Sequence, residues 1–257
     1  METPLRVFIT GASSGIGAAL ARYYAAQGAV LGLAARRADA LQALAAELGT
    51  PCHLYPLDVA DAPALAVAGA DFIDRAGVPD IVIANAGVSV GTLTEEADDL
   101  PAFRRVFDIN VMGMVHTFQP FVTGMRAVRR GRLVGIASVA GIRGLPGAGA
   151  YSASKAAAIA YLESLRVELR GSGVKVVTLA PGYIATAMTA KNPYPMPFLM
   201  PVERAVASMA RHIDKGSRFA VMPWQMGVVA GVMKWLPRPL YDLLFARAGR
   251  KPRGTLP

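Results

Sequence analysis

Apolar runs of strand length alternate with longer helical patterns along the whole chain. The predicted strands are residues 6–10, 30–35, 53–57, 81–85, 132–138, 174–180 and 218–222. Their hydrophobicity is continuous rather than alternating, which indicates that both faces of each strand are covered. The pattern therefore predicts an α/β fold, a doubly wound sheet of about seven parallel strands with helices on both faces.

The predicted helices occupy the segments between these strands. They are residues 15–27, 38–48, 62–76, 101–129 and 150–170, and a sixth begins near Val202. The 26 glycines and 18 prolines are spread along the chain and mark no linker, so we expect a single domain over residues 1–257. In a doubly wound sheet, ligands bind beyond the carboxyl ends of the strands. Functional residues are therefore expected directly after the strands.

Composition restricts the partners and the compartment. The formal net charge of +9 is compatible with phosphorylated cofactors, acidic substrates, anionic membranes or nucleic acid. No zinc-ligand spacing or aromatic-basic interleaving supports nucleic acid, so it is not a predicted partner. The single cysteine and the lack of a signal peptide lead us to expect a cytoplasmic protein. The three histidines have no evident partners, and no metal site is predicted.

A glycine-rich loop connects the first predicted strand to the first helix. It reads Gly-Ala-Ser-Ser-Gly-Ile-Gly from Gly11 to Gly17. Glycines allow a tight turn and a close approach to a pyrophosphate, whose charge is favoured at the N-terminus of the following helix. Placed in the first strand–helix connection of a doubly wound sheet, such a loop indicates dinucleotide binding.

A second cluster, Tyr-Ser-Ala-Ser-Lys at residues 151–155, opens a predicted helix. Positions i and i+4 share one face of a helix, so Lys155 can stand beside Tyr151. A cation there would stabilise the phenolate and lower the pKa of Tyr151 toward neutral pH. The simpler interpretation is an ordinary amphipathic helix start with a solvated lysine.

With further elements in a fixed order, these clusters make the chain resemble the short-chain dehydrogenase/reductase family. The family fingerprint is Thr-Gly-x-x-x-Gly-x-Gly, and the chain has it from Thr10 to Gly17. The other matching elements are Asn85-Ala86-Gly87, Asn110, Ser138, Tyr151 with Lys155, and Pro181-Gly182 with Thr186. The resemblance covers residues 7–186 and implies a Rossmann-type fold with a nicotinamide cofactor.

The resemblance implies a catalytic set of Asn110, Ser138, Tyr151 and Lys155. Tyr151 would exchange a proton with the substrate oxygen, which Ser138 would orient, and Lys155 would also bind the nicotinamide ribose. Asn110 would hold a water in a proton relay that reaches Lys155. Judged alone, Ser138 is equally consistent with a turn residue and Asn110 with a buried structural asparagine.

The resemblance also implies a set of residues that bind the cofactor. They are Gly11, Ser13, Ser14, Gly15, Ile16, Gly17, Arg36, Arg37, Asp58, Val59, Asn85, Ala86, Gly87, Tyr151, Lys155, Pro181, Gly182, Ile184 and Thr186. Among them, Asp58 would contact the adenine, although a carboxylate at that position could equally cap the next helix.

The end of the second predicted strand favours NADP(H) over NAD(H). A chain that binds NAD is expected to carry a carboxylate there for the ribose 2′-hydroxyl, whereas this chain has Arg36 and Arg37. Guanidinium groups pair well with a 2′-phosphate. We predict Arg36 as the phosphate ligand with Ser13 close by; the alternative is that both arginines only solvate a helix start.

Two segments near the C-terminus depart from regular structure. Residues 188–201 contain four prolines and are predicted to form a substrate loop. Residues 224–257 are predicted to form two apolar helical pieces, split by Pro237 and Pro239, and a basic tail. They fit a subunit interface or a cap over the pocket, or an amphipathic helix on an anionic membrane surface. No stretch reaches the roughly 20 apolar residues that span a bilayer.

The predicted function is hydride transfer between NADP(H) and a carbonyl or secondary alcohol substrate. A membrane-bound C-terminal segment would favour a hydrophobic substrate. The family resemblance implies a homodimer or homotetramer. The alternative is a catalytically inactive nucleotide-binding or membrane-associated scaffold protein of the same fold, against which the intact catalytic set argues.

Overall fold

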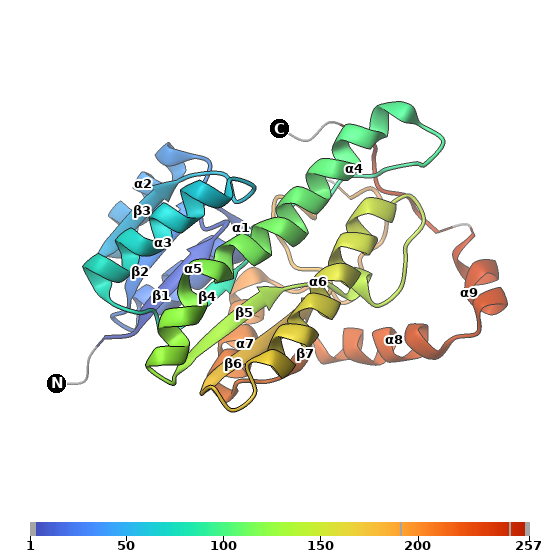
Figure 1. Cartoon of the computed structure of the whole chain (residues 1–257). Coiled ribbons are helices and arrows are strands. Elements are labelled where there is room, and N and C mark those ends of the chain that lie inside the picture. Colours follow the sequence, from blue (N-terminus) through green and yellow to red (C-terminus); the bar gives the residue numbers. More distant parts are fainter. Residues whose placement is uncertain (1–3, 191, 247, 255–257) are drawn as a thin grey trace.

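The chain forms one seven-stranded parallel sheet with helices on both faces (Figure 1). The computed structural model describes residues 4–190, 192–246 and 248–254. Three parts of the predicted segments lie outside the described residues: position 191 of the substrate loop, Arg247 of the basic tail, and both ends of the expected domain, residues 1–3 and 255–257.

The strand order is β3-β2-β1-β4-β5-β6-β7, and every neighbouring pair is parallel. The strands are β1 (Arg6–Thr10), β2 (Val30–Ala35), β3 (Cys52–Pro56), β4 (Ile81–Ala84), β5 (Gly131–Ile136), β6 (Val174–Pro181) and β7 (Phe219–Met222). The order reverses between β1 and β4, which is where a doubly wound sheet binds its ligand. The predicted fold class is confirmed.

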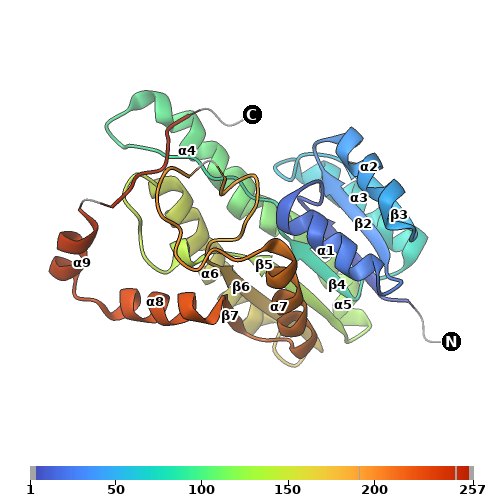
Figure 2. The ribbon, with the colours of Figure 1, turned by 180° about the vertical axis from the view of Figure 1, so that it is seen from behind.

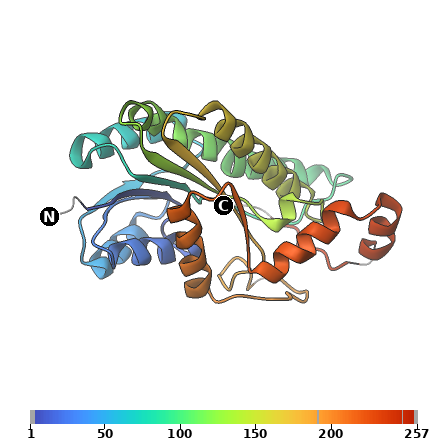
Figure 3. The same cartoon turned by 90° about the horizontal axis from the view of Figure 1, so that it is seen from below.

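The helices cover the two faces of the sheet. They are α1 (Gly15–Ala25), α2 (Ala38–Leu48), α3 (Ala62–Ala76), α4 (Leu100–Phe107), α5 (Gly113–Ala127), α6 (Gly149–Glu168), α7 (Val202–Lys215), α8 (Trp224–Trp235) and α9 (Arg238–Phe245). Figure 3 shows α1, α2 and α7 on one face and α3, α5 and α6 on the other. In β1, Val7 and Ile9 belong to the first buried cluster and Phe8 to the second. Continuous hydrophobicity therefore does reflect burial on both faces.

Some predicted boundaries were wrong, and the differences fall at the site. β4 ends at Ala84 and β5 at Ile136. Asn85 and Ser138 therefore lie in the loops after these strands, outside the regular sheet. The predicted helix 101–129 is divided into α4 and α5 by a π-helical turn, η2, at Asp108–Met112. Such turns insert an extra residue and are frequent at functional sites.

The two C-terminal helices extend away from the sheet (Figures 1 and 2). On α8, Trp224 is 73% exposed and Trp235 is 82% exposed, so the rest of the chain does not cover this apolar surface. Leu236 and Pro237 separate α8 from α9, whereas Pro239 lies in the first turn of α9. After α9 the chain returns toward α4 (Figure 2). None of the helices within the described ranges is both long and apolar enough to cross a membrane.

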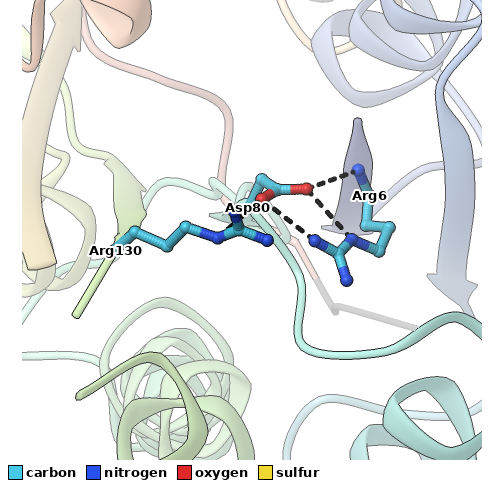
Figure 4. Close-up of polar contacts among 3 residues, drawn as sticks. All are labelled: Arg6, Asp80 and Arg130. Atoms are coloured by element: carbon cyan, nitrogen blue, oxygen red, sulfur yellow. Dashed lines mark hydrogen bonds and ion pairs between the residues drawn. The ribbon is translucent and has the colours of Figure 1, made fainter. Parts of the chain in front are cut away.

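An ion pair joins Arg6, the first residue of β1, to Asp80, which directly precedes β4 (Figure 4). Asp80 accepts hydrogen bonds from the Arg6 backbone N–H at 3.0 Å and from its Nε at 3.1 Å. The two side chains are only 19% and 17% exposed, and Arg130 lies 3.6 Å from the other carboxylate oxygen. The pair is therefore sheltered enough to contribute to stability.

Asp80→Ala is expected to lower the free energy of unfolding by about 1–3 kcal/mol, because it leaves the Arg6 guanidinium sheltered without its acceptor. Urea denaturation measures the change. The control is Glu47→Ala, which removes the pair between Arg22 and Glu47, where both side chains are about half exposed and much less stability is at stake. A loss for Asp80→Ala no larger than the control's would contradict the role assigned to this pair.

Candidate functional site

A cleft of about 500 Å³ lies at the carboxyl ends of the strands, at the reversal of strand order between β1 and β4. This volume suits a small-molecule or cofactor site. All of the predicted site residues line it except Gly17 and Asn110, which lie behind its wall. The cleft is also lined by Met188 and Thr189 of the predicted substrate loop. The lining residues that sequence analysis did not predict for the site are Ala35, Leu57, Val88, Ile109, Ile136, Ala137 and Ala187.

The glycine loop is packed so closely that two of its glycines admit no side chain. Gly11 has φ +66°, and a methyl group there would lie 2.7 Å from the Ala86 Cα. A methyl group at Gly17 would lie 2.2 Å from the Gly11 carbonyl oxygen. Asn85 holds the loop from the other side, since its Nδ2 donates to the carbonyls of Thr10 and Gly11 at 3.0 and 3.1 Å.

The N-terminus of α1 faces the cleft without a side-chain cap. Ser14 occupies the capping position, but its side chain makes no capping hydrogen bond, and no acidic residue lies in the first turn. The first N–H groups of a helix then remain available, and the helix dipole favours a negative charge beside them. A glycine loop followed by an uncapped helix start fits a pyrophosphate.

The arginines after β2 lie at one end of the cleft. It is Arg37 whose NH2 group donates to Ser13, to its Oγ at 3.2 Å and to its carbonyl at 3.3 Å. Arg36 also lines the cleft, and its charge acts on Asp58. Arg37 thus contacts the glycine loop directly, and the prediction that Arg36 is the phosphate ligand, with Ser13 close by, remains a prediction.

Asp58 is hydrogen-bonded by the Ala60 N–H and by Arg105, two partners that sequence analysis did not predict. Its Oδ1 accepts from the Ala60 N–H at 2.9 Å, and its Oδ2 pairs with Arg105 of α4. Burial would raise the pKa of Asp58, but the Ala60 N–H, Arg105 and the charge of Arg36 together lower it. Asp58 does not cap α3, because Asp61 does so by accepting from the Ala64 N–H at 3.0 Å.

Tyr151 and Lys155 lie on one face of α6, as their spacing predicts. The Lys155 Nζ is 5.9 Å from the centre of the Tyr151 ring, and both residues line the cleft. Ser138 caps the short η3 turn (Val139–Gly141), and its Oγ accepts from the Ala140 N–H at 3.1 Å. It also hydrogen-bonds the Tyr151 side chain. Ser138 is thus both a turn residue and a partner of Tyr151.

Burial sets the pKa of both titratable groups. Lys155 is 4% exposed, its Nζ donates to the Ile136 carbonyl at 2.8 Å, and burial lowers its pKa to about 8. Burial raises the pKa of Tyr151, and the hydrogen bond with Ser138 only partly opposes this. The expected lowering of the Tyr151 pKa by Lys155 is therefore not found, because desolvation of the phenolate dominates.

Asn110 lies in the π-helical turn η2, where the extra residue turns its side chain toward the loop after β4. Its Oδ1 accepts from the Val88 N–H at 2.8 Å, and its Nδ2 donates to the Val88 carbonyl at 3.0 Å and to the Ser154 Oγ at 3.0 Å. These contacts match the structural interpretation of this asparagine. They also place Asn110 near Lys155, since a methyl group at Gly87 would lie 3.3 Å from Asn110 Oδ1 and 3.5 Å from Lys155 Nζ.

The loop after β6 closes the cleft from the side opposite Asp58. Thr189 fixes its shape by donating to the Ile184 carbonyl at 2.6 Å and accepting from the Thr186 N–H at 3.0 Å. Thr186 lies beside the glycine loop, since a methyl group built on Gly15 would be 3.4 Å from the Thr186 methyl. Thr189 lies in the predicted substrate loop, but its role in shaping that loop was not predicted, because a threonine in an irregular proline-rich segment carries no signal of its own.

Comparison with known proteins agrees with this geometry. Residues 6–195 match the family model described as short chain dehydrogenase. An uncharacterized oxidoreductase of Myxococcus xanthus is 42% identical over 237 residues, which are 91% of this chain and 93% of the relative. The 2-dehydro-3-deoxy-L-rhamnonate dehydrogenase (NAD(+)) of a Sphingomonas species is 39% identical over 67% of this chain and 69% of its own length.

A solved structure shares the architecture as well. The alcohol dehydrogenase of the archaeon Thermococcus sibiricus, complexed with 5-hydroxy-NADP, superposes with a TM-score of 0.75 and 27% identity, over 85% of this chain and 95% of that one. The fingerprint loop, the strand order and the cleft are thus accompanied by similarity over most of the sequence. The chain belongs to the short-chain dehydrogenase family of oxidoreductases.

Proposed function

We propose that this protein transfers a hydride between NADP(H) and a carbonyl compound or the corresponding secondary alcohol, on a substrate with a largely apolar body. One observation carries the proposal. Tyr151, Lys155 and Ser138 lie in the same cleft as the glycine loop and the uncapped start of α1. The candidate proton donor, Tyr151, and the candidate dinucleotide site therefore line the same cleft.

Each side chain has a task in that space. The nicotinamide cofactor would supply or accept the hydride at the substrate carbon. In reduction, Tyr151 gives its proton to the carbonyl oxygen as that oxygen gains charge, and the phenolate regains a proton from solvent. Ser138 donates to the same oxygen and orients it. The Lys155 ammonium, buried beside the ring, stabilises the negative charge that passes to Tyr151.

The cofactor preference rests on the end of β2. That strand is followed by Arg36 and Arg37 rather than by a carboxylate, and both line the cleft. Guanidinium groups suit a 2′-phosphate, whereas the ribose 2′-hydroxyl of NAD calls for an acid. The relatives point both ways, since the Thermococcus structure was solved with 5-hydroxy-NADP and the Sphingomonas enzyme is named for NAD(+). The local charge supports NADP(H).

The remaining parts of the proposal concern the rim and the surface. Residues 188–201 would act as the substrate loop within a single domain over residues 1–257. The working protein would be a homodimer or homotetramer in the cytoplasm. The exposed apolar side chains of α8 and α9 support burial against another subunit or peripheral contact with a membrane surface. A catalytically inactive scaffold is less well supported, because Ser138, Tyr151 and Lys155 are all present and close together.

Tyr151→Phe removes only the phenolic hydroxyl, so it should lower kcat for carbonyl reduction by a factor of about 100 or more. Cofactor affinity should remain within a few fold of the wild type, because the ring stays in place. Steady-state NADPH oxidation and cofactor titration by fluorescence measure the two quantities. Turnover close to that of the wild type would remove Tyr151 from the proton transfer.

Arg36→Ala and Arg37→Ala should each weaken NADPH by about 10- to 100-fold while changing NADH little, because a charge-assisted hydrogen bond to the 2′-phosphate is lost. Calorimetric titration with both cofactors measures the ratio. Arg22→Ala is the control, since Arg22 pairs with Glu47 on the outer face of α1. Equal losses for NADPH and NADH would contradict the proposed preference for NADP(H).

Lys155 should make stability depend on pH in a defined window. The folded protein releases this proton near pH 8, whereas an unfolded lysine holds it to about pH 10.4. Between these values the unfolded chain binds more protons, so the unfolding free energy of the wild type should rise with pH relative to Lys155→Met, by on the order of 1–3 kcal/mol. Urea denaturation from pH 7.5 to 10.5 gives the difference curve. A flat curve would show that Lys155 is not desolvated as described.

A further inference from the structure

Residues 248–254, here called the C-terminal strap, return from α9 toward α4 (Figures 1 and 2). The strap contacts the substrate loop first. Gly249 lies against Tyr194, since a methyl group there would be 2.7 Å from the Tyr194 Cβ. Tyr194 in turn packs edge to face with Tyr183, with ring centres 6.5 Å apart. The strap thus rests on Tyr194, which belongs to an aromatic pair.

The strap is also fixed to the loop that follows β4. The Gly91 N–H donates to the Pro252 carbonyl at 2.9 Å, and a side chain at Gly91 would collide with the Lys251 carbonyl. Arg253 then pairs with Asp99 at 2.9 Å and with Glu96 at 3.0 Å. Asp99 is a buried acceptor that also receives the Leu93 N–H at 2.8 Å. These contacts hold the strap in one register.

That register places the ammonium of Lys251 next to Tyr151. The Lys251 Nζ lies 5.7 Å from the centre of the Tyr151 ring and donates to the Ser89 Oγ at 2.7 Å. The side chain is partly buried, and burial lowers its pKa to about 8. Among the described residues no carboxylate pairs with it, because Glu96 and Asp99 are engaged by Arg253. A partly buried cation without a counter-ion favours an anionic ligand.

We propose that Lys251 binds a carboxylate of the substrate, so that the protein acts on oxo acids and their hydroxy acids; this inference rests on the proposed function. The carbonyl reacts at the Tyr151 hydroxyl while the ammonium holds the acid group on the strap side of the ring. Tyr183 and Tyr194 offer apolar surface for the carbon chain between and beyond these groups. Lys251 is thereby a residue that determines specificity.

The donors at this position suit a carboxylate better than a phosphate. One ammonium and one serine hydroxyl can satisfy the two oxygens of a carboxylate. Phosphate sites usually offer arginine forks or several backbone N–H groups to three oxygens, and the described groups at this point offer neither. Of the two neighbouring arginines on the strap, Arg253 is already committed to two carboxylates. The stem of Arg250 lies along Gly147, where an added methyl group would be 2.9 Å from the Arg250 Cβ.

The test compares matched acids and methyl esters as substrates. The pairs are 2-oxobutanoate, 4-oxopentanoate and 5-oxohexanoate with their methyl esters, reduced with NADPH by wild type and Lys251→Met. The wild type should prefer the acid for at least one chain length. Lys251→Met should lower that acid-to-ester ratio of kcat/KM by about 30-fold, mostly through KM, because one charge-assisted hydrogen bond is lost.

Two further variants separate specificity from structure. Lys251→Arg should retain most of the acid preference, and Lys234→Met should leave it unchanged, because Lys234 is exposed on α8, where it lies over Trp235. If Lys251 only holds the strap in place, acid and ester rates would fall together and the ratio would stay constant. A constant ratio, or a wild type that prefers every ester, overturns the inference while leaving carbonyl reduction intact.

A binding measurement decides the matter without turnover. Butanoate, pentanoate and hexanoate are titrated calorimetrically into the NADPH-loaded wild type, Lys251→Met and Lys234→Met. Binding that Lys251→Met loses and Lys234→Met keeps supports a carboxylate site at Lys251, and it does so even if no carbonyl compound is reduced and the proposed reaction on oxo acids fails. No binding to the wild type, or equal binding to all three proteins, overturns it.

Discussion

The amide of Asn85 joins the two strands between which the strand order reverses. Its Nδ2 holds the carbonyls of Thr10 and Gly11, while the Thr10 Oγ1 receives the Asn85 N–H at 3.3 Å. The loops after β1 and β4 therefore cannot move independently. The glycine loop, the start of α1 and the wall formed by Ala86 and Gly87 take their positions from this contact. The shape of the cleft at this point depends on the contact between these two loops.

Much of the architecture could be predicted because it depends on local patterns. Continuous apolar runs identified the strands, since a strand buried on two faces cannot alternate. The spacing of Gly11, Gly15 and Gly17 identified the phosphate loop, and four residues of separation placed Tyr151 and Lys155 on one helix face. The strand ends then located the cleft, because parallel strands all deliver their carboxyl ends to one edge.

The features that could not be predicted depend on contacts between distant segments. No local pattern in residues 101–129 indicates the π-helical turn. The turn goes together with the hydrogen bonds of Asn110 to the backbone of Val88, which is distant in the sequence. The contact of Arg37 with Ser13 likewise joins residues 24 positions apart, and no local pattern indicates it. The direction of the Tyr151 pKa was missed for another reason, since burial in the folded protein outweighs a neighbouring cation.

The position of the strap links the order of synthesis to the completion of the site. Lys251 meets Ser89 across 162 positions of the chain, and Arg253 meets Asp99 across 154. Contacts of such separation form late, because loop closure must precede them and the strap has no strand or helix of its own. A ribosome-bound chain could therefore assemble the sheet and bring the loops after β1 and β4 together before the strap reaches Tyr151. The nascent protein would then have its glycine loop and Tyr151 in place before Lys251 arrives beside them.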